Sequence, residues 1–463
     1  MSSEQKKFTP LERRAVFGLS AIYGLRMFGL FLILPVLSIY AVKLEGSTPF
    51  LVGLTLGAYG IAQAILQIPF GLLSDKYGRK KLITIGLVIF ILGSLIAGLA
   101  DNIYWMIFGR ALQGSGAIAA AVLALTADLT RENQRSKSMA IIGLTIGSSF
   151  MLAFIAASPL VALFGFSGLF YVTAVLAVFA IFALWFYVPN QAPRSSRDVK
   201  FVASDFANLL KHQHLMRLNY GIFVLHCVLT AMFVVVPLLL SERVALSSSE
   251  HWKVYVPVML ASVVFMAPLV MASADKARLI RVFLFAIILL MIAQVILFIS
   301  KLDNVYSVAL CLFIFFVGFN ALEAMLPSLV TRVAPAAMKG TAVGIYNTFQ
   351  FSGVFIGGAV GGLLMGNGGV NGVFVFCGLL LASWALIVIL SPRVELYDSR
   401  LVRLTDPSLL ADAVVASRSK TLLSLAGVKD VTVIEQENIA YLKIDKSTFV
   451  VQALGDLEIV DNR

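Results

Sequence analysis

Charged side chains inside long apolar runs are the residues of this sequence that could do chemistry. Arg26, Arg110 and Glu323 each lie well within such a run, and His226 is the only histidine at comparable depth. Charged groups are costly inside a membrane and are therefore usually functional there. A buried carboxyl group can carry a proton, and histidine titrates near neutrality. These four residues are candidates for a route followed by protons or a polar solute.

Each candidate also has a structural alternative. Arg26 could extend towards the membrane surface or bond backbone carbonyls, and Arg110 could make a bond between helices. Glu323 could form a static ion pair with one of the arginines, and His226 could be held by a core hydrogen bond. Further polar side chains could line the same route or simply join helices, namely Gln63, Gln67, Asn320, Asn347 and Gln350.

The composition is that of a membrane protein. The chain has 463 residues, of which 59% are hydrophobic and 13% charged, and its mean hydropathy is +0.92. Ordinary soluble domains carry roughly 25% charged residues, so a soluble globular protein is excluded. A helix that crosses a bilayer needs about 20 mostly apolar residues. Twelve such runs occur, near 15–42, 51–73, 82–100, 104–127, 138–164, 168–188, 218–241, 252–274, 280–300, 305–330, 340–365 and 371–391.

The distribution of the basic residues predicts the topology. A net charge of +11 would suggest nucleic acid in a soluble protein, but here Lys and Arg lie mostly in short loops between the apolar runs. If the N-terminus is cytoplasmic, the loops on the opposite side hold only Lys43, Arg243, Lys253 and Lys301. This positive-inside bias predicts a multi-pass protein of the inner (plasma) membrane with both termini in the cytoplasm.

A faint internal repeat divides the twelve runs into six and six. Pro69 and Asp75 are echoed by Pro268 and Asp275, each pair at the loop after the second run of its half. Two parallel halves of this kind are a transporter architecture. The predicted parts are a first half (1–188), a cytoplasmic linker with a short amphipathic helix (189–217), a second half (218–391) and a cytoplasmic domain (392–463).

The last part has the composition of a small soluble domain. Its pattern predicts a strand over 400–404, a helix from 406 to about 426, strands over 428–435 and 439–445, and a short helix over 447–454. This order resembles a ferredoxin-like α+β domain. Some such domains bind metal through cysteines in the first loop, but residues 405–408 contain none, so a docking or regulatory module is expected. Its ligand could be the transporter body itself.

Two motifs carry a resemblance to a known family. The segment Gly71-Leu72-Leu73-Ser74-Asp75-Lys76-Tyr77-Gly78-Arg79-Lys80 resembles the signature loop of the major facilitator superfamily, between helices two and three. The segment from Phe108 to Gly114 resembles that superfamily's fourth-helix motif, which is common among its proton-coupled carriers. The resemblance covers about residues 10–395. With the appended domain, the whole chain is similar to YajR-type carriers, a drug/proton-antiporter-like subgroup.

The resemblance implies roles for several residues. In this superfamily helices one, four, seven and ten line the central cavity, and Arg110 would help to relay protons. The substrate and proton pathway would then comprise Arg26, Arg110, Glu323, His226, Gln113 and Asn320. In the loop, Asp75 would face the start of helix eleven and Arg79 would pair with Asp128, contacts that exist in only one access state. This conformational latch would comprise Gly71, Asp75, Gly78, Arg79, Lys80 and Asp128.

Glycines distinguish the fifth and eleventh helices. Drug/proton antiporters usually carry a Gly-Pro pair in the fifth helix, whereas this chain has Gly143 and Gly147 followed by serines. The eleventh helix has Gly353, Gly357 and Gly361 four residues apart, a spacing typical of close helix packing. The same face could instead be a sliding surface between the halves.

The expected function is proton-coupled export of a small organic solute by alternating access. Uptake of an anionic metabolite by symport is the alternative, suggested by the two buried arginines, and a transporter-like sensor that signals through its C-terminal domain is a third reading. The expected partners are the solute, protons and the lipid bilayer, without nucleic acid. No cofactor or metal site is expected, because the sequence has neither a phosphate-binding G-x-x-x-x-G-K-[ST] loop nor a metal-ligand cluster. The sequence also has no nucleophile and base at a spacing that would indicate an enzyme.

Overall fold

The chain forms two compact units. The computed structural model describes residues 7–190, 203–300, 304–335, 338–391, 398–403, 422–434, 439–444, 449 and 458–459. The first unit comprises Met1–Phe201, Asn219–Met325 and Gly344–Leu390, and thus most of both predicted halves. The second unit comprises Val202–Leu218, Leu326–Val343 and Ser391–Arg463.

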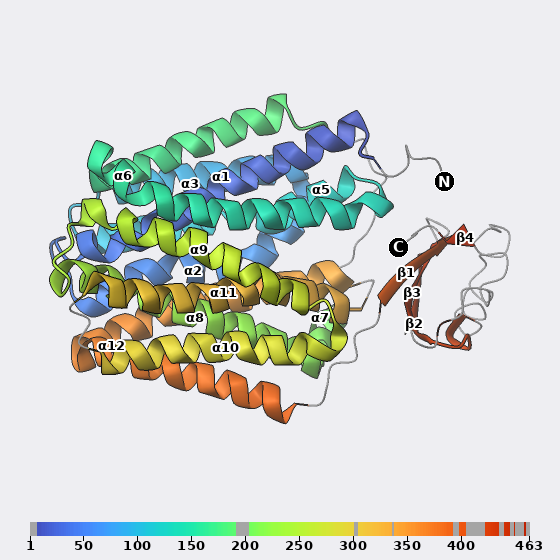
Figure 1. Ribbon diagram of the computed structural model, residues 1–463. Coiled ribbons are helices and arrows are strands. Elements are labelled where there is room, and N and C mark those ends of the chain that lie inside the picture. Colours follow the sequence, from blue (N-terminus) through green and yellow to red (C-terminus); the bar gives the residue numbers. More distant parts are fainter. Residues whose placement is uncertain are drawn as a thin grey trace. The chain divides into compact units, whose positions relative to one another are not determined.

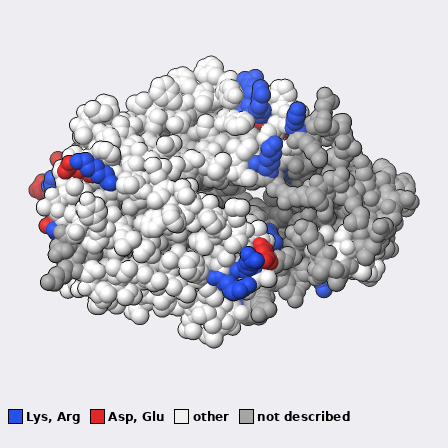
Figure 2. Space-filling view, viewed as in Figure 1, with Lys and Arg blue, Asp and Glu red and all other residues white. Residues whose placement is uncertain are grey.

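Long apolar helices build the first unit (Figure 1). Within the described residues, ten helical stretches are long and apolar enough to cross a membrane. Figure 2 shows charged side chains gathered towards two ends of the face in view, with a broad uncharged belt between them. The apolar helices in chain order are α1 Pro10–Ala41, α2 Pro49–Tyr77, α3 Arg79–Leu99, α4 Ile103–Ser115, α5 Ala119–Asp128, α6 Glu132–Phe186, α8 Gln213–Glu242, α9 Trp252–Ala272, α10 Lys276–Ile299, α11 Val305–Val333 and α12 Lys339–Leu390.

Two of these helices are each broken by one glycine. Gly165 in α6 has φ 72° and ψ 176°, and Gly369 in α12 has φ 61° and ψ −164°. Glycine enters this backbone region without the steric penalty of a Cβ atom. Each break separates two helical limbs, and Figure 1 shows α6 turning back on itself. The predicted runs on either side of each break therefore merge into one helical stretch, which reduces twelve runs to ten stretches.

The fourth predicted run is interrupted in its middle. It consists of α4 and α5, which are separated at Gly116. A Cβ atom on Gly114 would overlap the carbonyl oxygen of Tyr59 in α2, and one on Gly116 would overlap that of Gly86 in α3. The glycines allow three backbones to approach closely at this point.

Local signals start several of the helices. The side chains of Thr9, Thr48, Asn102 and Asp275 each accept a hydrogen bond from a backbone N–H in the first turn of α1, α2, α4 and α10, respectively. Such N-caps satisfy N–H groups that have no partner within the helix. The hairpin between α2 and α3 turns at Gly78, whose φ of 98° favours glycine.

Glycines on opposite faces of α12 pack it against two helices. Gly353 and Gly357 lie against backbone carbonyls of α8, whereas Gly358 and Gly362 lie against α2 at Gly53. The α8 contacts fall within the predicted second half, and the α2 contact joins the two halves. The predicted close packing of Gly353 and Gly357 is therefore present, and Gly358 and Gly362 make a second close contact across the predicted boundary between the halves.

The second unit contains the short helix α7 Ala203–Lys211 and an antiparallel sheet of four strands in the order β2-β3-β1-β4. The sheet packs a small core of Val402, Leu422, Val428, Ala440, Leu442 and Ile444. Most of the predicted helix over 406–426 and most of that over 447–454 lie outside the described residues. The strands are β1 Asp398–Arg403, β2 Val428–Ile434, β3 Ile439–Ile444 and β4 Glu458–Ile459.

Candidate functional site: a polar route inside the helical bundle

Arg26 lies in the middle of α1 with only 1% of its surface exposed. Its Nη2 donates a hydrogen bond of 2.5 Å to Oε1 of Gln63 in α2. Gln63 in turn donates from Nε2 to Oε1 of Gln67, one helical turn further along, at 3.2 Å. Both glutamines are buried, so a chain of polar groups follows α2 through the core.

Arg110 lies in α4 and is equally buried, at 1% exposed. Its Nη1 donates to Oε1 of Gln113 at 2.8 Å, and Nε2 of Gln113 donates to Oγ of Ser94 in α3 at 2.7 Å. Thr173 of α6 donates to the same Ser94 hydroxyl at 3.3 Å. The predicted pathway residues Arg110 and Gln113 thus head a network across three helices.

The ring of Tyr59 brings the two arginines together. The guanidinium carbon of Arg26 lies 5.8 Å from the ring centroid, and that of Arg110 lies 5.1 Å from it. Arg26 is also 5.9 Å from the ring of Phe90. Rings attract cations through their electron-rich faces. We call Arg26, Tyr59, Gln63, Arg110 and Gln113 the arginine cluster.

His226 and Glu323 meet in the predicted second half. His226 Nε2 in α8 lies 3.9 Å from Oε2 of Glu323 in α11 and 2.8 Å from Nε2 of Gln350 in α12. When His226 Nε2 is unprotonated, it accepts this bond from the Gln350 amide. The Glu323 side chain is 34% exposed. Of the two readings for Glu323, the static pair with an arginine is absent from the described residues. Its basic neighbour there is His226, which forms an ion pair with it only when protonated.

Asn320, another predicted pathway residue, faces a different helix. Its Nδ2 donates a hydrogen bond of 3.0 Å to Oγ of Ser262 in α9. This bond joins α11 to α9 and corresponds to the helix-joining alternative for this residue. The structure therefore groups Arg26 with Arg110 and His226 with Glu323, and it gives Asn320 a separate contact.

The turn at Gly78 between α2 and α3 is flanked by a chain of charges. Arg79 forms an ion pair with Asp75, its Nε lies 3.4 Å from Oδ2 of Asp128 at the end of α5, and its Nη1 donates to Oγ of Ser74 at 2.6 Å. Lys80 donates to the carbonyl oxygen of Val188 at 2.7 Å. The loop is thereby tied to α5 and to the end of α6. Contact between Asp75 and the start of the helix near residue 340 stays a prediction.

The glycines of the same loop differ in what surrounds them. A Cβ atom on Gly71 would lie 3.2 Å from the Cβ of Ala120 in α5, so α2 and α5 are close at this point. Gly78 has open space around it, and its positive φ alone requires glycine.

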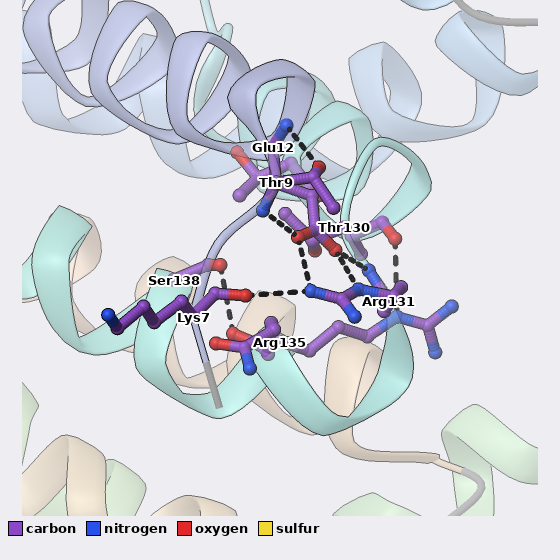
Figure 3. Close-up of polar contacts among 10 residues, drawn as sticks. Lys7, Thr9, Glu12, Thr130, Arg131, Arg135 and Ser138 are labelled. Atoms are coloured by element: carbon purple, nitrogen blue, oxygen red, sulfur yellow. Dashed lines mark hydrogen bonds and ion pairs between the residues drawn. The ribbon is translucent and has the colours of Figure 1, made fainter. Parts of the chain in front are cut away.

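The pair of Glu12 and Arg131 is a polar site that sequence reasoning missed (Figure 3). Arg131 donates from Nε and from its backbone N–H to Oε1 of Glu12 at 2.8 and 2.9 Å, and from Nη2 to Oε2 at 2.9 Å. Hydrogen bonding to Glu12 raises the pKa of the Arg131 guanidinium. Glu12 also closes a capping box with Thr9. The Thr-x-x-Glu spacing was visible in the sequence, but its link to Arg131 was not.

Aromatic side chains fill the space between the halves beside His226. Phe150 of α6 stacks on Phe319 of α11 at 5.9 Å, and Phe154 of α6 meets Phe233 of α8 at 5.1 Å. Nearby, Ser38 at the end of α1 donates to the carbonyl oxygen of Phe233 at 3.1 Å. The halves are thus in contact from the middle of the bundle to the end where α2 begins.

Three glycines of α6 and α12 have room for a side chain among the described residues. A Cβ atom on Gly143 or Gly147 in α6, or on Gly344 in α12, would meet nothing within 4 Å. These glycines face open space.

The fold and this polar interior define a membrane transporter. The protein belongs to the major facilitator superfamily, whose sequence profile matches residues 19–358. The chain is 41% identical over 440 residues, 95% of its length and 96% of the relative's, to the inner membrane transport protein YajR of Escherichia coli (strain K12). Family and relative are transporters, which confirms the expectation that the chain is not an enzyme.

More distant similarities agree with this family. The chain is 26% identical to multidrug resistance protein 2 of Bacillus subtilis (strain 168), over 76% of the chain and 89% of the relative. A bacterial homolog of the human lysosomal transporter Spinster, in an inward-facing and occupied conformation, has the same fold. It superposes with a TM-score of 0.69 at 14% identity, covering 83% of this chain and 97% of that one.

Proposed function

We propose that this protein is a proton-coupled secondary transporter that exports a small organic solute by alternating access. The observation that carries the proposal is the pair of His226 and Glu323, 3.9 Å apart on two helices and separate from the arginines. One proton shared between them leaves the pair neutral. Its loss leaves a negative charge that apolar surroundings disfavour unless water reaches it. Proton release is thereby linked to opening of the cavity.

The proposed architecture is twelve membrane spans in two halves of six. A straight helix of 55 residues would be about 80 Å long, far more than the roughly 30 Å of hydrocarbon that a bilayer offers. The breaks at Gly165 and Gly369 support two spans in each of α6 and α12. With the N-terminus in the cytoplasm, the end of the bundle where α2 begins, at which the predicted halves are in contact, would face outwards.

The loop of Asp75, Arg79 and Asp128 is proposed to act as the conformational latch. The ion pairs of Arg79 with both carboxylates join α2, α3 and α5 within the predicted first half and thereby fix the position of Asp75, which would make the contact across the halves. The C-terminal sheet is proposed to be a ferredoxin-like domain. Its antiparallel strand order β2-β3-β1-β4 supports that assignment.

Flux in inside-out membrane vesicles tests the proton coupling. With the lumen acidified and monitored by a quenched pH dye, an exporter releases lumenal protons when its solute is added outside. We expect a panel of small organic solutes to include one that relieves the quench. Glu323→Gln should abolish the response, whereas Glu250→Gln, in an exposed pair with Lys253, should leave it intact. Unchanged proton flux in Glu323→Gln would remove this residue as the proton site.

Symport is the second candidate mode, and the arginine cluster favours it. Two cations that have no carboxylate partner in the described part of the chain suit an anionic solute, whose uptake against an inside-negative potential needs accompanying protons. In the same vesicles a symporter responds only when the solute is loaded inside. The side of solute addition that relieves the quench therefore separates export from uptake.

A further inference from the structure

The two buried guanidinium groups have no counter-charge among the described residues. Neither Arg26 nor Arg110 forms an ion pair with any carboxylate in the described ranges. Nε and Nη1 of Arg26, Nε of Arg110 and the Tyr59 hydroxyl are buried and have no hydrogen-bond partner there. Buried charges in proteins are normally paired, and buried polar groups normally bonded. The unused donors therefore point to a missing acceptor.

The groups around the two guanidinium cations compensate only part of the cations' desolvation cost. Tyr59 and Phe90 offer ring faces, and one amide oxygen accepts from each guanidinium. Ring and amide contacts contribute less free energy than the desolvation of two guanidinium groups in one apolar core costs. The free donors suit an oxyanion, since guanidinium groups bind carboxylate or phosphate with charge-assisted bonds.

The cluster lies where the two halves meet. The ring of Phe351 in α12 lies 6.2 Å from the ring of Tyr59, and a Cβ atom on Gly60 would lie 2.6 Å from the Phe351 carbonyl oxygen. Phe351 also belongs to the same buried core cluster as Tyr59. Separation of α12 from α2 would uncover the Tyr59 side of the cluster, so a solute could reach it in the other access state.

We propose that the arginine cluster is the binding site for a small organic anion carrying a carboxylate or phosphate group. Arg26 Nε and Nη1, Arg110 Nε and the Tyr59 hydroxyl donate to the anion, and Gln63 and Gln113 hold the two guanidinium groups in place. This assignment rests on the proposed transport function and names its class of solute.

Thermal unfolding of the purified full-length protein in detergent tests the site. The probes are benzoate, succinate and phenyl phosphate, with benzamide as the neutral analogue, benzylamine as the cationic analogue and sodium chloride at matched ionic strength. We expect at least one organic anion to raise the melting temperature, and neither analogue nor chloride to do so. Stabilisation by the cation alone, by all salts alike, or by no anion would overturn the proposal.

Single-residue variants test whether the anion that raises the melting temperature binds at the arginine cluster. Arg26→Gln and Arg110→Gln should each weaken the anion titration roughly 10- to 100-fold, as expected for one lost charge-assisted contact. Arg26→Lys keeps a cation and should lose less anion affinity than Arg26→Gln. Arg278→Gln, whose side chain is 64% exposed, is the matched control and should titrate like the parent protein. Equal anion affinity in all four variants would overturn the site.

The outcomes separate this inference from the transport proposal. Anion binding should persist in Glu323→Gln, because that residue lies outside the cluster. Proton-coupled flux of a neutral or cationic solute, without anion binding, would refute the anion site and leave the transport function standing. Anion binding without solute-linked proton flux would support the anion site and refute the proton-coupled transport function.

Discussion

The buried arginines carry their charges at a cost to the folded state. Desolvation of an ion in a protein interior costs several kcal/mol, whereas a hydrogen bond to a charged group returns about 1.5–3 kcal/mol and a cation–π contact about 0.5–2 kcal/mol. Arg26 has one hydrogen bond and two ring contacts, and Arg110 has one of each. Without an anion the balance is unfavourable, which is typical of residues kept for function.

Replacing Arg26 by Met should therefore stabilise the anion-free protein. We expect a gain of about 1–4 kcal/mol, as for buried charges replaced by apolar side chains, less about 1 kcal/mol for the donor lost to Gln63. Thermal unfolding in detergent without organic anions measures the change. Arg278→Met, at an exposed site, should stay within about 0.5 kcal/mol of the parent. A clear loss of stability in Arg26→Met would identify Arg26 as a structural cross-link.

The sequence located the charged side chains within the helices better than it predicted which of them meet. Arg26, Arg110, His226 and Glu323 could be selected because a charge inside an apolar run is rare. Their neighbours could not, since contact depends on how helices far apart in the chain are rotated against each other. Glu323 was equally compatible with an arginine partner, and the structure places it beside His226.

At the scale of the helices, hydropathy located the apolar runs because a bilayer imposes a minimum length of about 20 apolar residues on each. It could not locate the interruption between α4 and α5. That break depends on Gly114 and Gly116, which lie against backbone atoms of α2 and α3. The break is caused by a contact between helices, and not by a local sequence signal that ends a helix.

Adding one methyl group at Gly114 tests this cause. Gly114→Ala places a Cβ atom against the Tyr59 carbonyl oxygen, and overpacking of this kind costs about 1–3 kcal/mol. Gly143→Ala in α6, where a Cβ atom meets nothing within 4 Å, should gain up to about 1 kcal/mol from helix propensity. Thermal unfolding compares the two. Equal behaviour of both variants would show that the close approach of α2 and α4 is not required.

At the scale of the whole molecule, one glycine-lined contact joins the two halves. Gly53 and Gly57 of α2 lie against α12 at Gly358 and Phe355. The hydroxyl of Tyr40 at the end of α1 lies 3.3 Å from that of Ser248, at the same end of the bundle. These contacts are available only while that end is closed. A shift of a few kcal/mol between two states is enough to change which one dominates.

A bulky residue in this contact should open the closed end. Gly53→Leu cannot fit against the Gly358 carbonyl oxygen, so we expect the population to move to a state in which α2 and α12 are apart. Spin labels on Lys43→Cys and Lys253→Cys, beyond α1 and near the start of α9, report this movement as a longer interlabel distance; Cys227, Cys311 and Cys377 are buried and can stay. Gly143→Leu adds the same bulk in α6, where the glycine faces open space. It should leave the distance unchanged, because no described residue lies against this glycine. An unchanged distance in Gly53→Leu, with the protein still folded, would show that the glycine contact does not hold the closed end.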